Sequence, residues 1–68
     1  MKLPIKSIDH GHKKGIAYTT EDNYVIFVKP IEKIGQFHFE IDGLGIWFIA
    51  GSTDMGFLIV SKILDGIV

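Results

Sequence analysis

The chain lacks cysteine and arginine, and these two absences exclude several kinds of site. Without cysteine it can form neither a disulfide nor a thiolate metal centre. Without arginine it cannot make the bidentate contacts that this side chain gives to guanine or phosphate. The net charge of −1 argues further against general nucleic-acid binding, which depends on many cations. Absence of cysteine suits a reducing compartment, so we expect a cytoplasmic protein.

A long uninterrupted hydrophobic run is also missing. The most apolar stretch, residues 43–64, contains Asp54 and Lys62, whereas a membrane-spanning helix needs about 20 predominantly apolar residues. The first residues lead into polar sequence and not into the apolar segment of a signal peptide. We therefore expect no membrane association and no signal peptide.

What the chain has in excess is apolar side chains. It has 68 residues, of which 47% are hydrophobic and only 22% are charged, and this length predicts one domain spanning residues 1–68. A domain of this size buries only about 60% of the surface of its unfolded chain. Because so many apolar side chains are hard to hide in so small a domain, we expect a homo-oligomer, most simply a dimer, or burial against another protein.

The clearest local signal is Asp42-Gly43 between two apolar runs. Asp-Gly is the preferred loop of a two-residue hairpin, in which both loop residues adopt positive φ. This register places His38 opposite Trp47 on neighbouring strands. One face of the hairpin then carries a core of Phe37, Phe39, Ile41, Leu44, Ile46 and Phe48. The other face carries Gln36, His38, Glu40, Trp47 and Ile49.

Three further segments are predicted to be strands. Residues 24–29 are β-branched and aromatic and are followed by Pro30, which should end the strand. Residues 15–20 form the preceding strand, with a turn at residues 21–23, and residues 3–8 form an edge strand. Together they predict an α+β fold: an antiparallel meander of about five strands, curled or closed into a partial barrel, with one C-terminal helix. The expected core is Ile16, Tyr18, Ile26, Val28, Phe37, Phe39, Ile46 and Phe48.

The C-terminal segment changes its periodicity. Asp54, Ser61, Lys62 and Asp65 fall on one helical stripe with apolar residues elsewhere, which predicts a helix over residues 53–65. Ser52 or Thr53 would cap its start, and Gly66 would end it. A glycine inside the segment and several β-branched residues leave a sixth strand as the alternative.

The loop of residues 10–15 is the most unusual stretch, and it lies in the cationic part of the chain. Residues 1–20 carry a net charge of +3 and residues 21–68 a net charge of −4, which add to −1. Glycines allow backbone N–H groups to converge on an anion, and lysines add positive charge. One hypothesis is therefore a nucleotide or other phosphate-bearing ligand held by Lys6, His10, Gly11, His12, Lys13 and Lys14. The alternative is a solvated loop, because the segment matches no phosphate-binding fingerprint.

Metal and catalytic sites have little support in the sequence. His10 and His12 would share a face if extended, and His38 could be a third ligand, but no spacing typical of a metal motif joins them. No serine, histidine and acid stand in a hydrolase motif, and the chain is short for a deep pocket. We expect no metal, no cofactor and no enzymatic activity.

The pair His38 and Trp47 indicates a binding surface, because tryptophan is enriched at interface hot spots. Alternatively the C-terminal helix packs over this face and buries Trp47. From the surface reading we expect a non-enzymatic protein-interaction module, in which Trp47, His38, Glu40, Ile49 and Asp42 contact a larger protein. Short, arginine-free chains of this composition are typical of mobile elements and phages, so an inhibitor of a host protein is the specific form expected. Binding of the phosphate-bearing ligand by the 10–15 loop is the alternative function.

Overall fold

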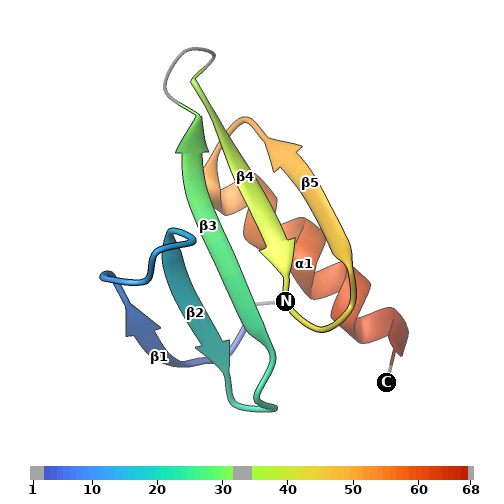
Figure 1. Cartoon of the computed structure of the whole chain (residues 1–68). Helices are drawn as coiled ribbons and strands as arrows, with labels where there is room; N and C mark the ends of the chain where they lie inside the picture. The colour runs from blue at the N-terminus through green and yellow to red at the C-terminus, as the bar shows by residue number, and fades with distance from the viewer. Residues whose placement is uncertain (1–2, 32–34, 68) are drawn as a thin grey trace.

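In the part of the chain that the structure describes, five strands are followed by one helix (Figure 1). The structure is a computed structural model that describes residues 3–31 and 35–67. Its elements are β1 (Ile5–Asp9), β2 (Ile16–Thr20), β3 (Val25–Ile31), β4 (Gln36–Ile41), β5 (Ile46–Ala50) and α1 (Thr53–Ile67). The predicted helix is confirmed, which excludes the sixth strand.

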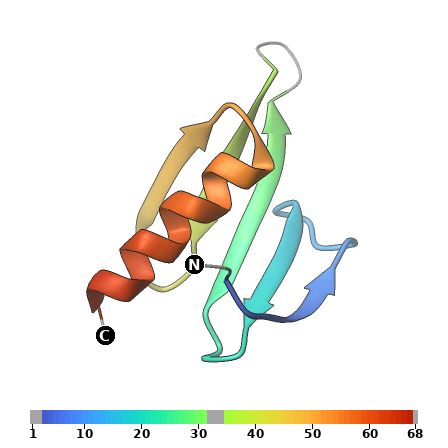
Figure 2. The same ribbon diagram turned by 180° about the vertical axis from the view of Figure 1, so that it is seen from behind.

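The strands form one antiparallel sheet in the order β1-β2-β3-β4-β5, so each strand pairs with its neighbour in the sequence. This confirms the predicted α+β meander with a C-terminal helix. The expected curl into a partial barrel is wrong, because β1 and β5 lie at opposite edges of an open sheet. Closure would require the two edges to meet around one face, and α1 lies across that face (Figure 2).

β3 continues through Pro30 to Ile31 and does not stop before the proline. The pairing of β2 with β3 ends at Val28, which lies opposite Ile16, whereas the pairing of β3 with β4 extends to Ile31. Beyond Val28, β3 has a partner on one side only. A strand tolerates proline where its missing N–H has no partner to bond, and this explains the extra length.

The β4–β5 connection is longer than the Asp42-Gly43 loop that we predicted. Gly43 has φ 82° and Gly45 has φ 67°, while Asp42 is not among the residues with positive φ. The Asp42 N–H donates to Val25 O of β3 at 2.9 Å, which holds Asp42 in line with β4. The chain therefore turns over residues 42–45, and Ile41 lies opposite Ile46. Leu44, predicted in the core, is in the loop and exposed.

The hydrophobic core lies between one face of the sheet and α1. Its buried members come from β3, β4, β5 and the helix: Ile26, Val28, Phe39, Ile41, Ala50, Val60 and Leu64. Of the predicted core, Ile26, Val28 and Phe39 are buried, and Tyr18, Phe37, Ile46 and Phe48 are half-buried against the cluster. Ile16, the first residue of β2, is half-buried as well.

The helix begins at a cap and packs through a glycine. The Met55 N–H donates to Ser52 Oγ at 3.2 Å, so Ser52 is the N-cap. Gly56 is buried against Phe39, and a methyl group in its place would overlap the Phe39 ring. One prediction was wrong, because the helix continues through Gly66 to Ile67. Ser61, which belongs to the polar stripe, is buried like its neighbour Val60.

No helix in the described residues is long and apolar enough to cross a membrane.

Candidate functional site

The sheet has one covered face and one open face. Phe39 stacks edge-on against Phe57 of α1, with ring centroids 5.3 Å apart, so the helix covers the face that carries Phe39. Phe48 lies opposite Phe39, so the adjacent Trp47 lies on the other face of the sheet and is 62% exposed. This open face is turned toward the viewer in Figure 1. The alternative in which α1 buries Trp47 is therefore wrong. One face of the sheet carries aromatic side chains on β2 and β4 and β-branched side chains on β3. The helix packs on that face.

On the open face, the rings of His38 and Trp47 stack with centroids 5.3 Å apart and planes inclined by 17°. The predicted register placed His38 directly opposite Trp47, and this was wrong. Glu40 lies opposite Trp47, and His38 lies opposite Ile49. His38 therefore reaches Trp47 diagonally, a distance that aromatic side chains can span. We call the surface formed by Trp47, Ile49, His38 and Glu40 the hairpin face.

The 10–15 loop folds back onto the same side of the sheet and covers Phe27 of β3. The ring of His12 lies 4.6 Å from the Phe27 ring, and Lys14 Nζ lies 5.3 Å from its centroid. Phe27 is only 7% exposed even though its face carries no helix. This contact was not predicted, because β3 is apolar on both sides and its sequence gives no sign of what covers the second face.

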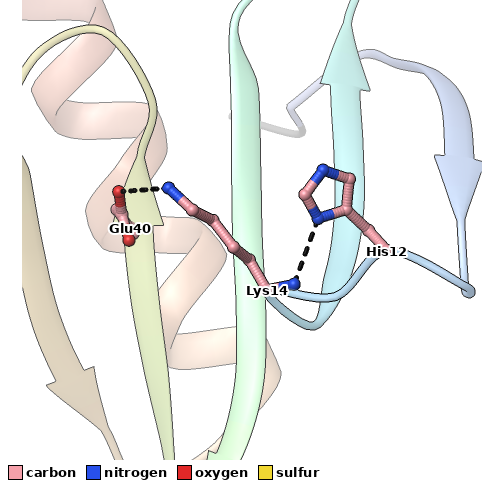
Figure 3. Close-up of polar contacts among 3 residues, drawn as sticks. All are labelled: His12, Lys14 and Glu40. Carbon is pink, nitrogen blue, oxygen red and sulfur yellow. Dashed lines mark hydrogen bonds and ion pairs between the residues drawn. The ribbon is translucent and has the colours of Figure 1, made fainter.

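An ion pair joins the loop to the hairpin face. Lys14 Nζ lies 3.8 Å from Glu40 Oε2 (Figure 3), with the two side chains 51% and 35% exposed. Glu40 itself lies between Phe27 on one side and Trp47 on the other in the pairing of the strands. The 10–15 loop, suggested for anion binding, and the hairpin face, suggested for protein binding, are thus neighbours on one surface.

The backbone of the 10–15 loop is occupied by its own polar groups. The Gly11 N–H donates to Asp9 Oδ1 at 2.9 Å. The Lys14 N–H donates to His12 Nδ1 at 3.1 Å (Figure 3), and the Gly15 N–H donates to His12 O at 3.1 Å. An anion held by this loop would have to compete with these acceptors, the first of which is a carboxylate.

The structure does not bring all residues of the suggested anion site together. Lys6 Nζ donates to Asn23 Oδ1 at 2.7 Å, in the turn between β2 and β3. That turn lies at the other end of the β1–β2 hairpin from the 10–15 loop (Figure 1). His10 and Lys13 are exposed on the loop. The cationic side chains are therefore divided between the two ends of the hairpin.

The remaining candidate, Asp42, is exposed at the start of the β4–β5 connection. Its backbone serves the sheet through the bond to Val25. It lies at the tip of the β4–β5 hairpin that bears Trp47, but outside the hairpin face.

The three histidines do not gather into a metal site. His12 packs on Phe27 and His38 stacks on Trp47, each with a different neighbour. Over residues 3–31 and 35–67 there is no group of three histidine, cysteine or acidic side chains placed to hold a metal ion.

A second apolar surface lies beside the helix. Leu3, Ile5, Tyr18 and Phe57 line an open pocket of about 190 Å³ between the first strands and α1. The pocket exists because α1 packs mainly against β4 and β5. Nothing in its lining supplies a charge or a reactive group.

No family model matches the chain, and neither a curated protein nor a solved structure matches it. What can be said of its function therefore depends on the geometry described above.

Proposed function

We propose that the chain is a non-enzymatic protein-interaction module that binds a larger protein through the hairpin face. The observation that carries this proposal is Trp47, a large aromatic side chain that is 62% exposed on a regular strand. It is the only tryptophan of the chain. Most exposed apolar side chains need no explanation, but tryptophan has the largest apolar surface to lose and is the residue most enriched at hot spots.

The setting of Trp47 favours binding because its ring stacks on the ring of His38. Stacking on His38 restricts the rotamers of the tryptophan before a partner arrives. A contact side chain that is already ordered loses less entropy on association, and this cost is otherwise about 0.5–1.5 kcal/mol per side chain. Ile49, which is 44% exposed beside them, extends the apolar centre of the surface.

Charged groups surround this centre and suggest the character of the partner. Glu40 lies beside Trp47 and is paired with Lys14, and Asp42 lies at the hairpin tip, outside the hairpin face. Both acids belong to the part of the chain that carries a net charge of −4. Acidic groups at the rim of an interface steer it toward a basic surface and raise the association rate. A basic surface of a host protein, inhibited when the hairpin face covers it, is the specific form of the proposal.

The test is capture of a partner by the wild-type chain and by two matched variants. Trp47→Ala removes the proposed anchor, and Leu58→Ala removes an exposed apolar side chain of α1. A hot-spot tryptophan contributes about 2 kcal/mol or more, which corresponds to a loss of affinity of about 30-fold. We expect a partner that wild type and Leu58→Ala retain and that Trp47→Ala loses. Equal binding by all three folded proteins would remove the hairpin face as the site.

The alternative function, anion binding by the 10–15 loop, is distinguished in a parallel experiment. Thermal shift against phosphate and a panel of nucleotides would detect it, because a ligand that binds the native state raises its melting temperature. His10 and Lys13 are exposed there. A shift that Lys13→Ala abolishes, together with failure of the capture experiment, would replace the proposal by this one.

A further inference from the structure

The two edges of the sheet differ in how well they are protected against pairing with another strand. Edge strands expose unpaired backbone groups, and proteins block them with charges, proline or bulges. β1 has Lys6 and Asp9 and an irregular register between Ile5 and Ser7. β5 has the sequence IWFIA, without a charge or a proline, and pairs with β4 in unbroken register.

The hydrogen-bonding pattern shows which backbone groups of β5 point outward. In an antiparallel sheet, alternate residues bond to alternate neighbours. Because the Asp42 N–H donates to Val25 O of β3, the even-numbered residues of β4 bond to β3 and the odd-numbered ones bond to β5. Their partners in β5 are even-numbered, since Phe39 pairs with Phe48. The N–H and C=O groups of Trp47 and Ile49 therefore point away from the sheet.

We propose that β5 pairs with β5 of a second copy of the chain, antiparallel, about a twofold axis at Phe48. In this register the outward groups of Trp47 meet those of the second copy's Ile49. Such a pair exchanges two backbone hydrogen bonds, and the axis repeats the pair at the other end. A second copy fits this edge because it satisfies the outward groups of Trp47 and Ile49 on both strands and, since β5 is uncharged, opposes no like charges.

The same register brings together the two most exposed apolar side chains of the strand. Trp47 is 62% exposed and Ile49 is 44% exposed, and both lie on the open face. Directly opposed residues on neighbouring strands have their Cβ atoms about 4.5–5.5 Å apart. Each tryptophan would therefore contact an isoleucine of the other copy, and no charged side chain of β5 would oppose another across the axis.

This inference concerns the edge of the sheet, whereas the proposed function concerns its open face. Edge pairing leaves the outer surfaces of Trp47 and His38 accessible, so a dimer would present two hairpin faces on one continuous sheet. Either idea can therefore fail without the other.

The test exploits the direction of the Ile49 N–H. Ile49→Pro removes this outward donor but none of the bonds between β4 and β5, whereas Ile49→Val retains it. Sedimentation velocity across the micromolar range should show a dimer for wild type and for Ile49→Val. The apparent mass should fall by half for Ile49→Pro, with circular dichroism unchanged.

A charge offers a second variant in case the proline disturbs folding. Ile49→Lys places like charges near each other across the axis, while Leu58→Lys places the same charge at an equally exposed position of α1, since the two side chains are 44% and 43% exposed. We expect Ile49→Lys to be a monomer and Leu58→Lys a dimer. A monomeric wild type would overturn the proposal, and so would a folded Ile49→Lys or Ile49→Pro that still dimerises.

Hydrogen exchange locates the interface without any substitution. The amides of Trp47 and Ile49 should become protected as the concentration of wild type rises, while amides at the β1 edge should not change. Protection confined to β1 or to α1 would show a different interface. If the wild-type chain is a monomer and Trp47→Ala loses the larger protein partner, the dimer alone is overturned. If the wild-type chain is a dimer and Trp47→Ala binds the larger protein equally well, the proposed function alone is overturned.

Discussion

Replacing Gly56 by alanine tests the packing of the helix on the sheet. An alanine Cβ at this position would lie 2.6 Å from Cε2 of Phe39 and closer still to Cζ and Cε1. Carbon atoms in contact are normally about 3.5–4.0 Å apart. Either the Phe39 ring must turn or the helix must move away by about 1.5 Å to restore normal contact distances.

The ring has no room to turn. Phe39 is fully buried, stacks on Phe48 with centroids 5.3 Å apart and planes inclined by 4°, and meets Phe57 edge-on. Forcing extra carbon into a packed core costs about 1–3 kcal/mol, and this overlap belongs at the upper end. Alanine gains about 1 kcal/mol over glycine in helix propensity. The difference is a destabilisation of about 2 kcal/mol for Gly56→Ala.

Chemical denaturation followed by the fluorescence of Trp47 would measure this change. For a domain of this size, about 2 kcal/mol lowers the melting temperature by about 8–16 °C. Gly66→Ala is the control, because Gly66 is in the same helix and has no atom within 4 Å of an added Cβ. It should be neutral or slightly stabilising.

A double-mutant cycle identifies the contact itself. Phe39→Leu removes part of the ring, so its cost should be smaller in the Gly56→Ala background than in wild type. If Gly56→Ala were as stable as Gly66→Ala, or if the two core substitutions were additive, the reasoning that places the helix on the Phe39 ring would be refuted.

Further substitutions test the loop, the cap and the ion pair. Gly15 has φ 119°, and an added Cβ would lie 2.5 Å from a β3 carbonyl oxygen. Gly15→Ala should therefore lower the free energy of unfolding by about 1–3 kcal/mol in urea denaturation. Equal stability of Gly15→Ala and Gly11→Ala would contradict this. Ser52→Ala removes the helix cap and should cost about 1 kcal/mol by thermal melting; an unchanged melting temperature would argue against the cap. Lys14→Ala and Glu40→Gln should each cost less than about 1 kcal/mol, because both side chains are solvent-accessible. Their coupling in a double-mutant cycle should fall with added salt, and a coupling unaffected by salt would exclude a screened ion pair.

The faces of the β4–β5 hairpin could be predicted although its register could not. Phe39 was expected opposite Ile46 and lies opposite Phe48, two residues further along. A slip of one residue would have exchanged the faces, but a slip of two preserves them. Trp47 and Phe39 are therefore on opposite sides, as predicted. The signal that was overlooked is Gly45, whose positive φ extends the turn beyond Asp42-Gly43.

Contacts made by folding back across the sheet could not be predicted. Nothing in the local pattern shows that His12 and Lys14 would cover Phe27, because their contact depends on how the loop returns over β3. The helix was predictable from its period, but Gly56 counted against it. Glycine weakens a helix in isolation, and only the ring beneath it explains why glycine stands there.

The order of the strands has a consequence for how the chain folds. Because each strand pairs with the one before it, hairpins can form by local encounters, and such local topologies fold rapidly. The apolar face with Ile26 and Phe39 is different, because α1, which covers it, is synthesised after β1 to β5. During translation a paired sheet would carry an open apolar face until residues 53–67 leave the ribosome, and a chain interrupted before them would expose that face to aggregation.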